Sequence, residues 1–258
     1  MLYQDPAKSI DGWLHSLCGA AIYSLLYIQR QQGVSGNSLE IGVYLGKTIA
    51  HFICDRETDE ITIGVDPFVY DFQPKGLKNA NIYNQAIENI KKLNSTQKIK
   101  GETILLKGYS TEENIINAVK KYANTFRVVS IDGGHGYKDV MNDLSLASEV
   151  SMKEGVLIVD DYCNPICPEV TNAIKDFLSN SPQGKMWKIT FVIVPDCSPL
   201  SGATRIFLQR KDCNLEYGLL IATTLAEINF PQNDQNISDY AHLIVDLYGS
   251  SAHVLMAK

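Results

Sequence analysis

Short apolar runs alternate with amphipathic stretches along most of the chain. Five runs rich in Ile and Val are too short for helices and are typical of buried parallel strands; they cover residues 38–43, 60–65, 103–106, 127–131 and 155–160. Helical periodicity follows each of them, near residues 46–55, 80–93, 111–123, 138–150 and 168–179. Five strand–helix units in succession predict a parallel sheet with right-handed crossovers and helices on both faces.

Local signals predict where several helices begin. Ahead of the first strand, an apolar face runs from Trp13 to Ile28, with Asp11 as the expected N-cap and Gly33 just past the helix end. Ser110–Glu113 has the form of a capping box, and Pro168 stands in the first turn of the last helix.

The end of the chain departs from the strand–helix pattern. Two apolar runs, 187–194 and 204–210, are joined by a loop with no room for a helix, which predicts an antiparallel hairpin. The expected fold is therefore α/β, a Rossmann-like, doubly wound, mostly parallel seven-stranded sheet closed by that C-terminal hairpin. The tail predicts two helical pieces around the polar break Pro231–Asn236, which would serve as a lid or a dimer contact. We expect a helical cap (1–37), a main domain (38–210) and a helical extension (211–258), with the extension able to support a homodimer.

Composition narrows the class of protein. The chain has 258 residues, 45% of them hydrophobic, which is enough to bury a sizeable core. A net charge of −6 argues against a nucleic-acid-binding surface. No apolar stretch approaches the ~20 residues of a membrane span, and the N-terminus has no signal-peptide pattern. Six scattered cysteines exclude a disulfide scaffold, and the close pair Cys163 and Cys167 lacks neighbours to complete a zinc site. We expect a soluble cytoplasmic protein that handles a small molecule.

In a parallel sheet the residues just after each strand form the ligand site. The first strand runs into Glu40-Ile41-Gly42-Val43-Tyr44-Leu45-Gly46-Lys47-Thr48, where two glycines and a helix N-terminus suit close approach to an anionic group. A tight turn with no ligand is the plain alternative. A phosphate loop of an ATPase is a further alternative, but it needs four residues between its glycines, and Gly42 and Gly46 enclose three.

An acidic residue follows the second strand. Asp66 lies about twenty residues beyond the glycine turn, where a carboxylate grips the ribose diol of a nucleoside cofactor. NAD and S-adenosylmethionine both carry such a ribose. The alternative is a surface aspartate that opens a turn before Pro67.

Three more aspartates follow the fourth and fifth strands. Asp132 opens Asp-Gly-Gly-His, and Asp160 and Asp161 end an apolar strand, where adjacent carboxylates are costly to leave unpaired. A hard cation such as Mg²⁺ would bind all three. The alternative is that one caps a helix and another pairs with a lysine. His135, three residues after Asp132, is a candidate general base facing the same cavity.

These motifs, from Glu40-Ile41-Gly42 to Asp160-Asp161-Tyr162, resemble class I S-adenosylmethionine-dependent methyltransferases. More narrowly, they resemble the metal-dependent sugar O-methyltransferases of macrocin and mycinamicin type and their cephalosporin-hydroxylase-like relatives. The resemblance covers 38–178, and Tyr44 departs from it where many methyltransferases have a glycine. The resemblance implies that the cofactor is bound by Glu40, Gly42, Gly46, Asp66, Ser110 and Asp132. It implies that a metal is bound by Asp132, Asp160 and Asp161. It also implies that His135 and Asp132 are the catalytic residues.

The expected function is O-methylation of a hydroxyl on a small-molecule natural product or sugar, with S-adenosylmethionine and Mg²⁺. A histidine of pKa ~6.5 is poorly matched to an alcohol of pKa ~15.7, a gap on the order of 12 kcal/mol, so a cation that acidifies the hydroxyl is needed. The alternatives are a carboxyl or N-methyltransferase, a non-methylating oxidoreductase, and a cofactor-binding protein without chemistry. Gly42-Val43-Tyr44 breaks the glycine pattern of a dinucleotide-binding dehydrogenase.

Overall fold

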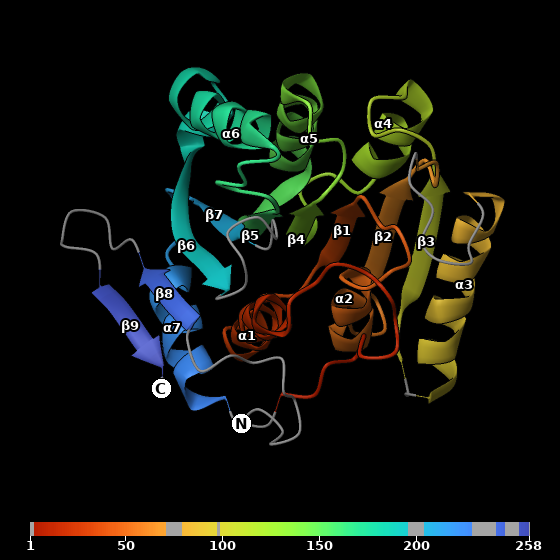
Figure 1. Cartoon of the computed structure of the whole chain (residues 1–258), viewed down its shortest axis with the longest axis horizontal. Coiled ribbons are helices and arrows are strands. Elements are labelled where there is room, and N and C mark those ends of the chain that lie inside the picture. The colour runs from red at the N-terminus through yellow and green to blue at the C-terminus, as the bar shows by residue number, and fades with distance from the viewer. Residues whose placement is uncertain are drawn as a thin grey trace.

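One mixed sheet runs through the molecule (Figure 1). The computed structural model describes residues 3–70, 79–96, 99–195, 204–228, 241–245 and 253–257. The strand order is β3-β2-β1-β4-β5-β7-β6-β8-β9. The strands are β1 (Asn37–Ile41), β2 (Ile61–Asp66), β3 (Glu102–Lys107), β4 (Phe126–Ile131), β5 (Ser151–Val159), β6 (Trp187–Pro195), β7 (Arg205–Arg210), β8 (Ala241–Val245) and β9 (His253–Ala257).

The first five strands form the parallel part that the alternating pattern predicted. Leu39 of β1 pairs with Ile63 of β2 on one side and Val129 of β4 on the other. Strand order reverses between β1 and β4, so the loops that follow these two strands diverge. In such a sheet that divergence is where a ligand binds.

The predicted antiparallel hairpin is confirmed, with its second strand inside the sheet. β7 lies between β5 and β6, pairing Val159 with Ile206 and Ile189 with Leu208. The fold class is confirmed, and β8 and β9 extend the predicted seven strands to nine.

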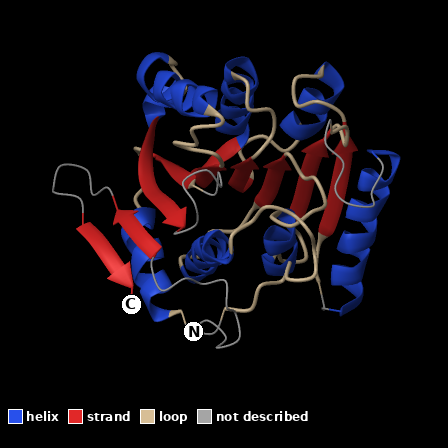
Figure 2. Cartoon of the chain, in the orientation of Figure 1, coloured by secondary structure: helices blue, strands red, loops and turns tan. Residues whose placement is uncertain are grey.

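Helices cover both faces of the sheet (Figures 1 and 2). One face carries α4, α5 and α6, and the other carries α1, α2, α3 and α7, each layer sealing its own apolar core. The helices are α1 (Ser16–Gln31), α2 (Ile49–Asp55), α3 (Asn79–Thr96), α4 (Glu113–Lys120), α5 (Tyr137–Val150), α6 (Pro168–Asn180) and α7 (Tyr217–Glu227), with a short 3₁₀ turn, η1 (Gly184–Met186).

The predicted start of the first helix is wrong. α1 begins at Ser16, and its N-cap is His15, whose Nδ1 accepts the backbone N–H of Leu17 at 3.2 Å. Asp11 cannot act as the cap because Gly12, at φ +146°, turns the chain away from helical geometry. Trp13 therefore lies outside the helix, with 70% of its surface exposed.

The predicted capping box is also misplaced. α4 begins at Glu113 with Glu112 at the N-cap, and the Glu112 carboxylate accepts the backbone N–H of Tyr109 at 2.9 Å. Ser110 does not cap the helix, because its hydroxyl bonds to Asp143 of α5 instead.

The described part of the tail is helical in the first predicted piece, and in the second piece its described residues form the strands β8 and β9. α7 packs against α1, and β8 pairs with β6, Val192 opposite Ile244. Each of these apolar runs has five residues, too short for a stable helix, and the free edge of β6 offers unpaired backbone groups. The break Pro231–Asn236 lies outside the described residues.

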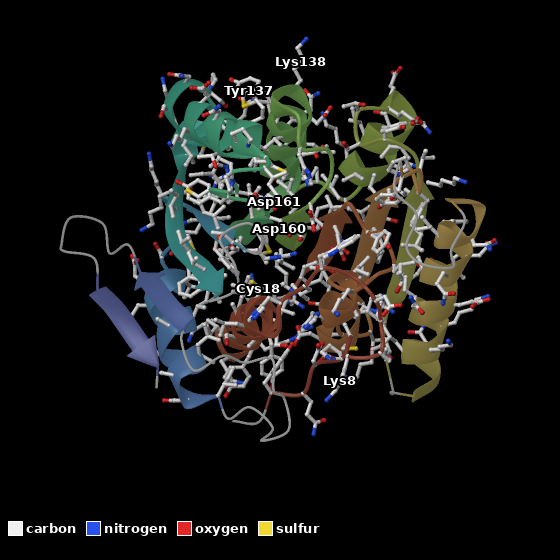
Figure 3. All side chains as sticks on the ribbon, viewed as in Figure 1. Lys8, Cys18, Tyr137, Lys138, Asp160 and Asp161 are labelled. Atoms are coloured by element: carbon white, nitrogen blue, oxygen red, sulfur yellow. The ribbon has the colours of Figure 1, made fainter. Side chains whose placement is uncertain are left out.

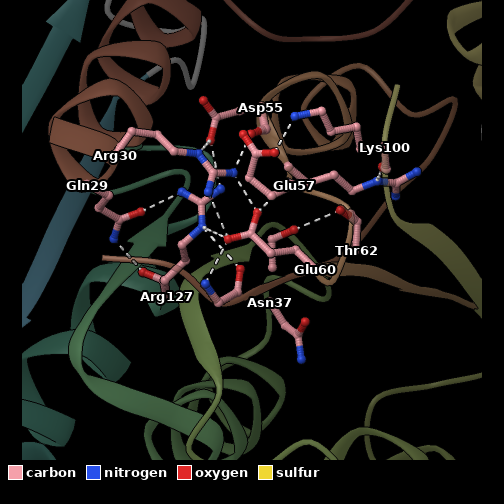
Figure 4. Close-up of polar contacts among 12 residues, drawn as sticks. Gln29, Arg30, Asn37, Asp55, Glu57, Glu60, Thr62, Lys100 and Arg127 are labelled. Atoms are coloured by element: carbon pink, nitrogen blue, oxygen red, sulfur yellow. Dashed lines mark hydrogen bonds and ion pairs between the residues drawn. The ribbon is translucent and has the colours of Figure 1, made fainter. Parts of the chain in front are cut away.

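A polar network ties the amino ends of the central strands to the helices (Figure 4). Buried Arg127 donates to Gln29 at 2.9 Å and to Asp55 at 2.7 Å. Arg30 donates to Glu60, and Gln29 returns a bond to the Arg127 carbonyl at 2.7 Å. This cluster lies at the opposite edge of the sheet from the loops that follow β1 and β4.

Candidate active site

Backbone hydrogen bonds bring the loops after four strands together. The N–H of Gly42 bonds to the carbonyl of Val65 at 2.9 Å, and that of Asp132 bonds to Ile41 at 2.8 Å. The N–H of Asp160 bonds to Ile131 at 3.0 Å. The sheet ladder thus continues one residue beyond the strands and sets Gly42, Asp132 and Asp160 side by side.

A cavity of about 270 Å³ opens at this edge. Of the predicted cofactor-binding residues, Gly42, Asp66, Ser110 and Asp132 line it, whereas Glu40 and Gly46 do not. The remaining lining residues are Ile41, Val65, Pro67, Val69, Tyr70, Gly108, Tyr109, Thr111, Gly133, Gly134 and Asp139.

Asp66 is 1% exposed, and its carboxylate already has three donors. Oδ2 accepts the N–H of Tyr44 at 2.8 Å and the hydroxyl of Tyr70 at 2.5 Å. Oδ1 accepts the N–H of Phe68. The Asp66 carboxylate is therefore held in one orientation, and both Asp66 and Tyr70 line the cavity.

Gly42 and Gly46, the two glycines of the turn, are needed for different structural reasons. Both have φ +91°, which disfavours any residue with a β-carbon. A β-carbon on Gly42 would lie 1.8 Å from the Asp132 carbonyl oxygen, whereas one on Gly46 would meet nothing closer than 3.5 Å. Gly42 therefore lets the loops after β1 and β4 pack against each other beneath the cavity.

The contacts of Tyr44 account for a tyrosine at a position where many methyltransferases have a glycine. Its backbone adopts φ +50°, and its N–H is used by Asp66. Its ring lies between Trp13 and Tyr70, with centroids 5.1 Å away on each side. These tilted and edge-on ring contacts hold Tyr44 in a backbone conformation that would otherwise favour glycine.

Glu40 lies beneath the cavity rather than on its wall. The side chain is 1% exposed, and Oε2 has no hydrogen-bond partner among the described residues. Burial first, and the charge of Asp132 second, raise the pKa of Glu40 well above its usual range, against the opposing effect of Arg205.

Asp160 and Asp161 lie close together in the middle of the molecule but face different partners (Figure 3). Asp160 is buried, and its Oδ2 accepts Nη2 of Arg205 at 2.7 Å, while its Oδ1 has no partner among the described residues. The same Nη2 lies 3.5 Å from Oδ2 of Asp132. Burial, and then the neighbouring carboxylates, raise the pKa of Asp160 although Arg205 opposes them.

Asp161 turns toward His135 instead. Its φ of +59° swings the carboxylate out of the line of β5, and Oδ2 lies 3.0 Å from Nε2 of His135. Asn164 holds the other oxygen at 2.8 Å. His135 Nε2 is 3.9 Å from Asp132, and the Asp132 and Asp161 carboxylates raise the pKa of His135 against desolvation.

Three further residues of this site escaped sequence reasoning. Arg205 has no motif, although a charged residue inside the apolar run 204–210 was a signal. Cys167 places Sγ 3.4 Å from Nδ1 of His135. Asp143 is buried behind Gly133, and its pKa rises to about 7, mainly through burial.

Metal-binding geometry can be judged from the ligand atoms. In the described part of the chain, ligand atoms within 4.8 Å of one another belong to His135, Asp161 and Cys167, so a different trio from the predicted three aspartates meets this spacing. Among the described residues, the buried guanidinium that faces the carboxylates of Glu40, Asp132, Asp160 and Asp161 is that of Arg205. The unpartnered Oδ1 of Asp160 is an oxygen that a divalent cation would complete, so the residues fit a cation.

Among the described residues, every helix is too short or too polar to cross a membrane.

Comparison with known proteins agrees with the motifs. Residues 39–162 match the family model described as "Methyltransferase domain". An uncharacterised protein of Acanthamoeba polyphaga mimivirus is 25% identical over 166 residues, 62% of this chain and 67% of the viral protein.

Solved structures share the fold at low identity. Cofactor-bound Rv0187 from MTB is 11% identical, with a TM-score of 0.52 over 81% of this chain and 92% of its own. CalS11, a calicheamicin methyltransferase, is 15% identical, with a TM-score of 0.51 over 77% and 82%. The matched methyltransferase domain spans the strands and loops that line the cavity, and together with the shared fold it supports an S-adenosylmethionine-dependent methyltransferase.

Proposed function

We propose that this methyltransferase acts on a hydroxyl group of a small molecule and that a divalent cation assists it. The observation that carries the proposal is the position of His135. Its Nε2 lies 3.0 Å from Oδ2 of Asp161 and 3.9 Å from Oδ1 of Asp132, and Asp132 lines the cavity. A proton acceptor next to oxygen ligands is the arrangement that an alcohol acceptor requires.

The cofactor side of the cavity supports a nucleoside ligand. S-adenosylmethionine supplies a methyl group on a positively charged sulfur. Asp66 offers carboxylate oxygens to ribose hydroxyls, and the wall at Gly108–Ser110 suits the adenine. Glu40 and Asp132 favour a cationic ligand above them, because each raises the cost of the other's negative charge.

The acceptor side is defined by what histidine can do. Holding the acceptor oxygen in line with the methyl group can contribute ~7–11 kcal/mol, but deprotonating an alcohol remains difficult. A cation held by Asp132, Asp160 and Asp161 would lower the pKa of the bound hydroxyl. A carboxylate acceptor is ionised at neutral pH and needs neither base nor cation, so the site favours a hydroxyl.

His135 is placed to take the proton. Its side chain is 47% exposed, so an acceptor can reach it. Asp161 orients the ring and stabilises the imidazolium that forms, as a carboxylate does for a catalytic histidine. CalS11 is a calicheamicin methyltransferase, and we extend the natural-product class of acceptor, including the sugars implied by the motifs, to this chain as part of the proposal.

Thermal melts with S-adenosylhomocysteine, in chelator and then in Mg²⁺, test the proposal. Ligand at a hundred times its Kd stabilises by ~2.7 kcal/mol, which is several degrees at roughly 2–4 °C per kcal/mol. We expect a shift with the nucleoside and a further shift with Mg²⁺. Asp66→Ala should lose the first shift, and Asp161→Asn should lose only the second.

Asp212→Asn is the matched control, since Asp212 pairs with Arg210 away from the cavity. It should behave as the wild type in both melts. A wild-type protein that shifts with ATP or NAD but not with S-adenosylhomocysteine would contradict the cofactor. Full methyl transfer in chelator would contradict the cation.

A further inference from the structure

Arg205 is a fully buried cation at the centre of the site. It opens β7, and because Val159 pairs with Ile206, the next pair along this antiparallel ladder is Asp160 and Arg205. On its other side Arg205 pairs with Ile193 of β6. The side chain is 1% exposed, so the position of β7 between β5 and β6 delivers a guanidinium directly under the carboxylates.

One nitrogen of Arg205 serves two acidic residues. Nη2 donates to Oδ2 of Asp160 at 2.7 Å and lies 3.5 Å from Oδ2 of Asp132. Nη2 thus makes a hydrogen bond with Asp160 and a longer ion pair with Asp132, in each case with Oδ2, and Oδ1 of Asp132 is the oxygen nearer to His135. Oδ1 of Asp160 and Nη1 of Arg205 have no hydrogen-bond partner among the described residues.

This arrangement divides the work of the two adjacent aspartates. Asp160 stays in the interior, anchored by Arg205, whereas Asp161 turns out to His135. A guanidinium suits the anchoring role because it is planar, always charged and presents several donors in fixed directions. A lysine would bring one point charge and could not hold two carboxylates in one geometry.

We propose that Arg205 is a positioning residue of the cation site: it holds Asp160 and Asp132 by one oxygen each, so that their other oxygens face the cation. The inference rests on the proposed function. It assigns Arg205 no contact with the acceptor or the methyl group.

An ordinary structural ion pair would look different. Arg127, also 1% exposed, uses its guanidinium on Gln29, Asp55 and the carbonyl of Gly36, and leaves no nitrogen without a partner. In contrast, Nη1 of Arg205 has no hydrogen-bond partner among the described residues, and neither has Oδ1 of the adjacent Asp160. Buried ion pairs add little stability by themselves, so stability alone is a weak reason for a guanidinium here.

Titration of Mn²⁺, followed by electron paramagnetic resonance in saturating S-adenosylhomocysteine, tests the inference. Arg205→Lys keeps the charge and loses the fork, and we expect at least a tenfold weaker Mn²⁺ affinity with nucleoside affinity within threefold of wild type. Arg210→Lys is the matched control on the same strand, where the half-buried Arg210 pairs with Asp212, and it should match the wild type. Arg205→Met, where it folds, should bind Mn²⁺ no better than Arg205→Lys.

The outcomes separate this inference from the function on which it rests. Wild-type Mn²⁺ affinity in Arg205→Lys would overturn it alone. Tighter Mn²⁺ binding in Arg205→Met than in the wild type would also overturn it, because Arg205 would then only compete with the cation for the carboxylates. A wild-type protein that binds the nucleoside but no Mn²⁺ would overturn both this inference and the proposed cation.

Discussion

At the scale of single residues, the site is defined by how each carboxylate is partnered. Asp66 already accepts two backbone N–H groups and the Tyr70 hydroxyl. The ribose hydroxyls of a cofactor would therefore meet an oxygen that Tyr70 holds. Binding of the nucleoside should cost the Tyr70–Asp66 bond.

Tyr70→Phe should tighten the binding of S-adenosylhomocysteine about tenfold or more, because a hydrogen bond to a charged group contributes ~1.5–3 kcal/mol, which binding to the variant would not have to give up. Calorimetric titration measures the change. Tyr83→Phe is the control, since Tyr83 packs on Phe68 in the same region. Weaker binding in Tyr70→Phe would show that the hydroxyl contacts the cofactor itself.

Asp143 makes the fold sensitive to pH. Its pKa rises from 3.8 to about 7 because the side chain is buried behind Gly133. The folded state then holds a proton that the unfolded chain releases, so the free energy of unfolding falls as pH rises from about 4 to about 7. A difference of about three pKa units, at ~1.4 kcal/mol each, gives an upper limit of about 4 kcal/mol.

Asp143→Asn should remove this loss, so that the variant loses less stability than the wild type between pH 5 and pH 8. Urea denaturation at the two pH values measures it. Asn can still bond to Ser110, which keeps the comparison to the charge alone. Equal pH dependence in the two proteins would mean that other groups carry it.

At the scale of elements, the glycine turn after β1 shows why a motif can be right for a different reason. The sequence suggested that Gly42 lets a ligand approach, but the closest atom to its missing β-carbon is the Asp132 carbonyl oxygen. Gly42 joins two loops, and the cavity forms as a result. Gly46 shares its φ without that contact.

Gly42→Ala should therefore destabilise the protein far more than Gly46→Ala. Positive φ alone costs a residue with a β-carbon ~1–2 kcal/mol, and we expect about that for Gly46→Ala. Gly42→Ala adds the clash with Asp132, so its melting temperature should fall further by several degrees, or the protein should fail to fold. Similar losses in the two variants would contradict the packing role of Gly42.

The elements themselves were largely predictable. In each of the five strand–helix units, the strand is a short apolar run and the helix is an amphipathic stretch. Both patterns can be recognised in the sequence without knowledge of tertiary contacts. The starts of α1 and α4 were not predictable in this way. His15 and Glu112 are capping residues only because of the turns at Gly12 and Tyr109, and the residues with better capping propensity, Asp11 and Ser110, are used elsewhere or excluded.

At the scale of the whole molecule, the amino ends and the carboxyl ends of the central strands differ in their balance of charges. At the amino ends, Arg30 and Arg127 meet Asp55 and Glu60, so charges are matched (Figure 4). At the carboxyl ends, the described residues include four carboxylates, those of Glu40, Asp132, Asp160 and Asp161, against the guanidinium of Arg205. Ion pairs thus stabilise the amino ends of the strands, whereas the carboxyl ends stay acidic, and we expect cationic ligands there.

Site residues next to parallel strands could be predicted, and those brought by the last strands could not. Gly42, Asp66, Ser110 and Asp132 line the cavity because each follows a strand whose position in the sheet the pattern implied. Arg205 lies 45 residues beyond Asp160. Its place depends on β7 inserting between β5 and β6, and on β8 pairing with β6 rather than forming a helix, which no local pattern encodes.

The insertion of β7 also sets an order on synthesis. A chain is synthesised from its N-terminus. β7 lies between β5 and β6 in the sheet but follows β6 in the sequence, so β7 is made after both of its neighbours. Until residue 205 has left the ribosome, Asp160 ends β5 without its cation, and β6 has no neighbour between itself and the parallel sheet. The carboxylates of the site are therefore synthesised before the guanidinium that balances them, so the site cannot be complete until β7 has been made.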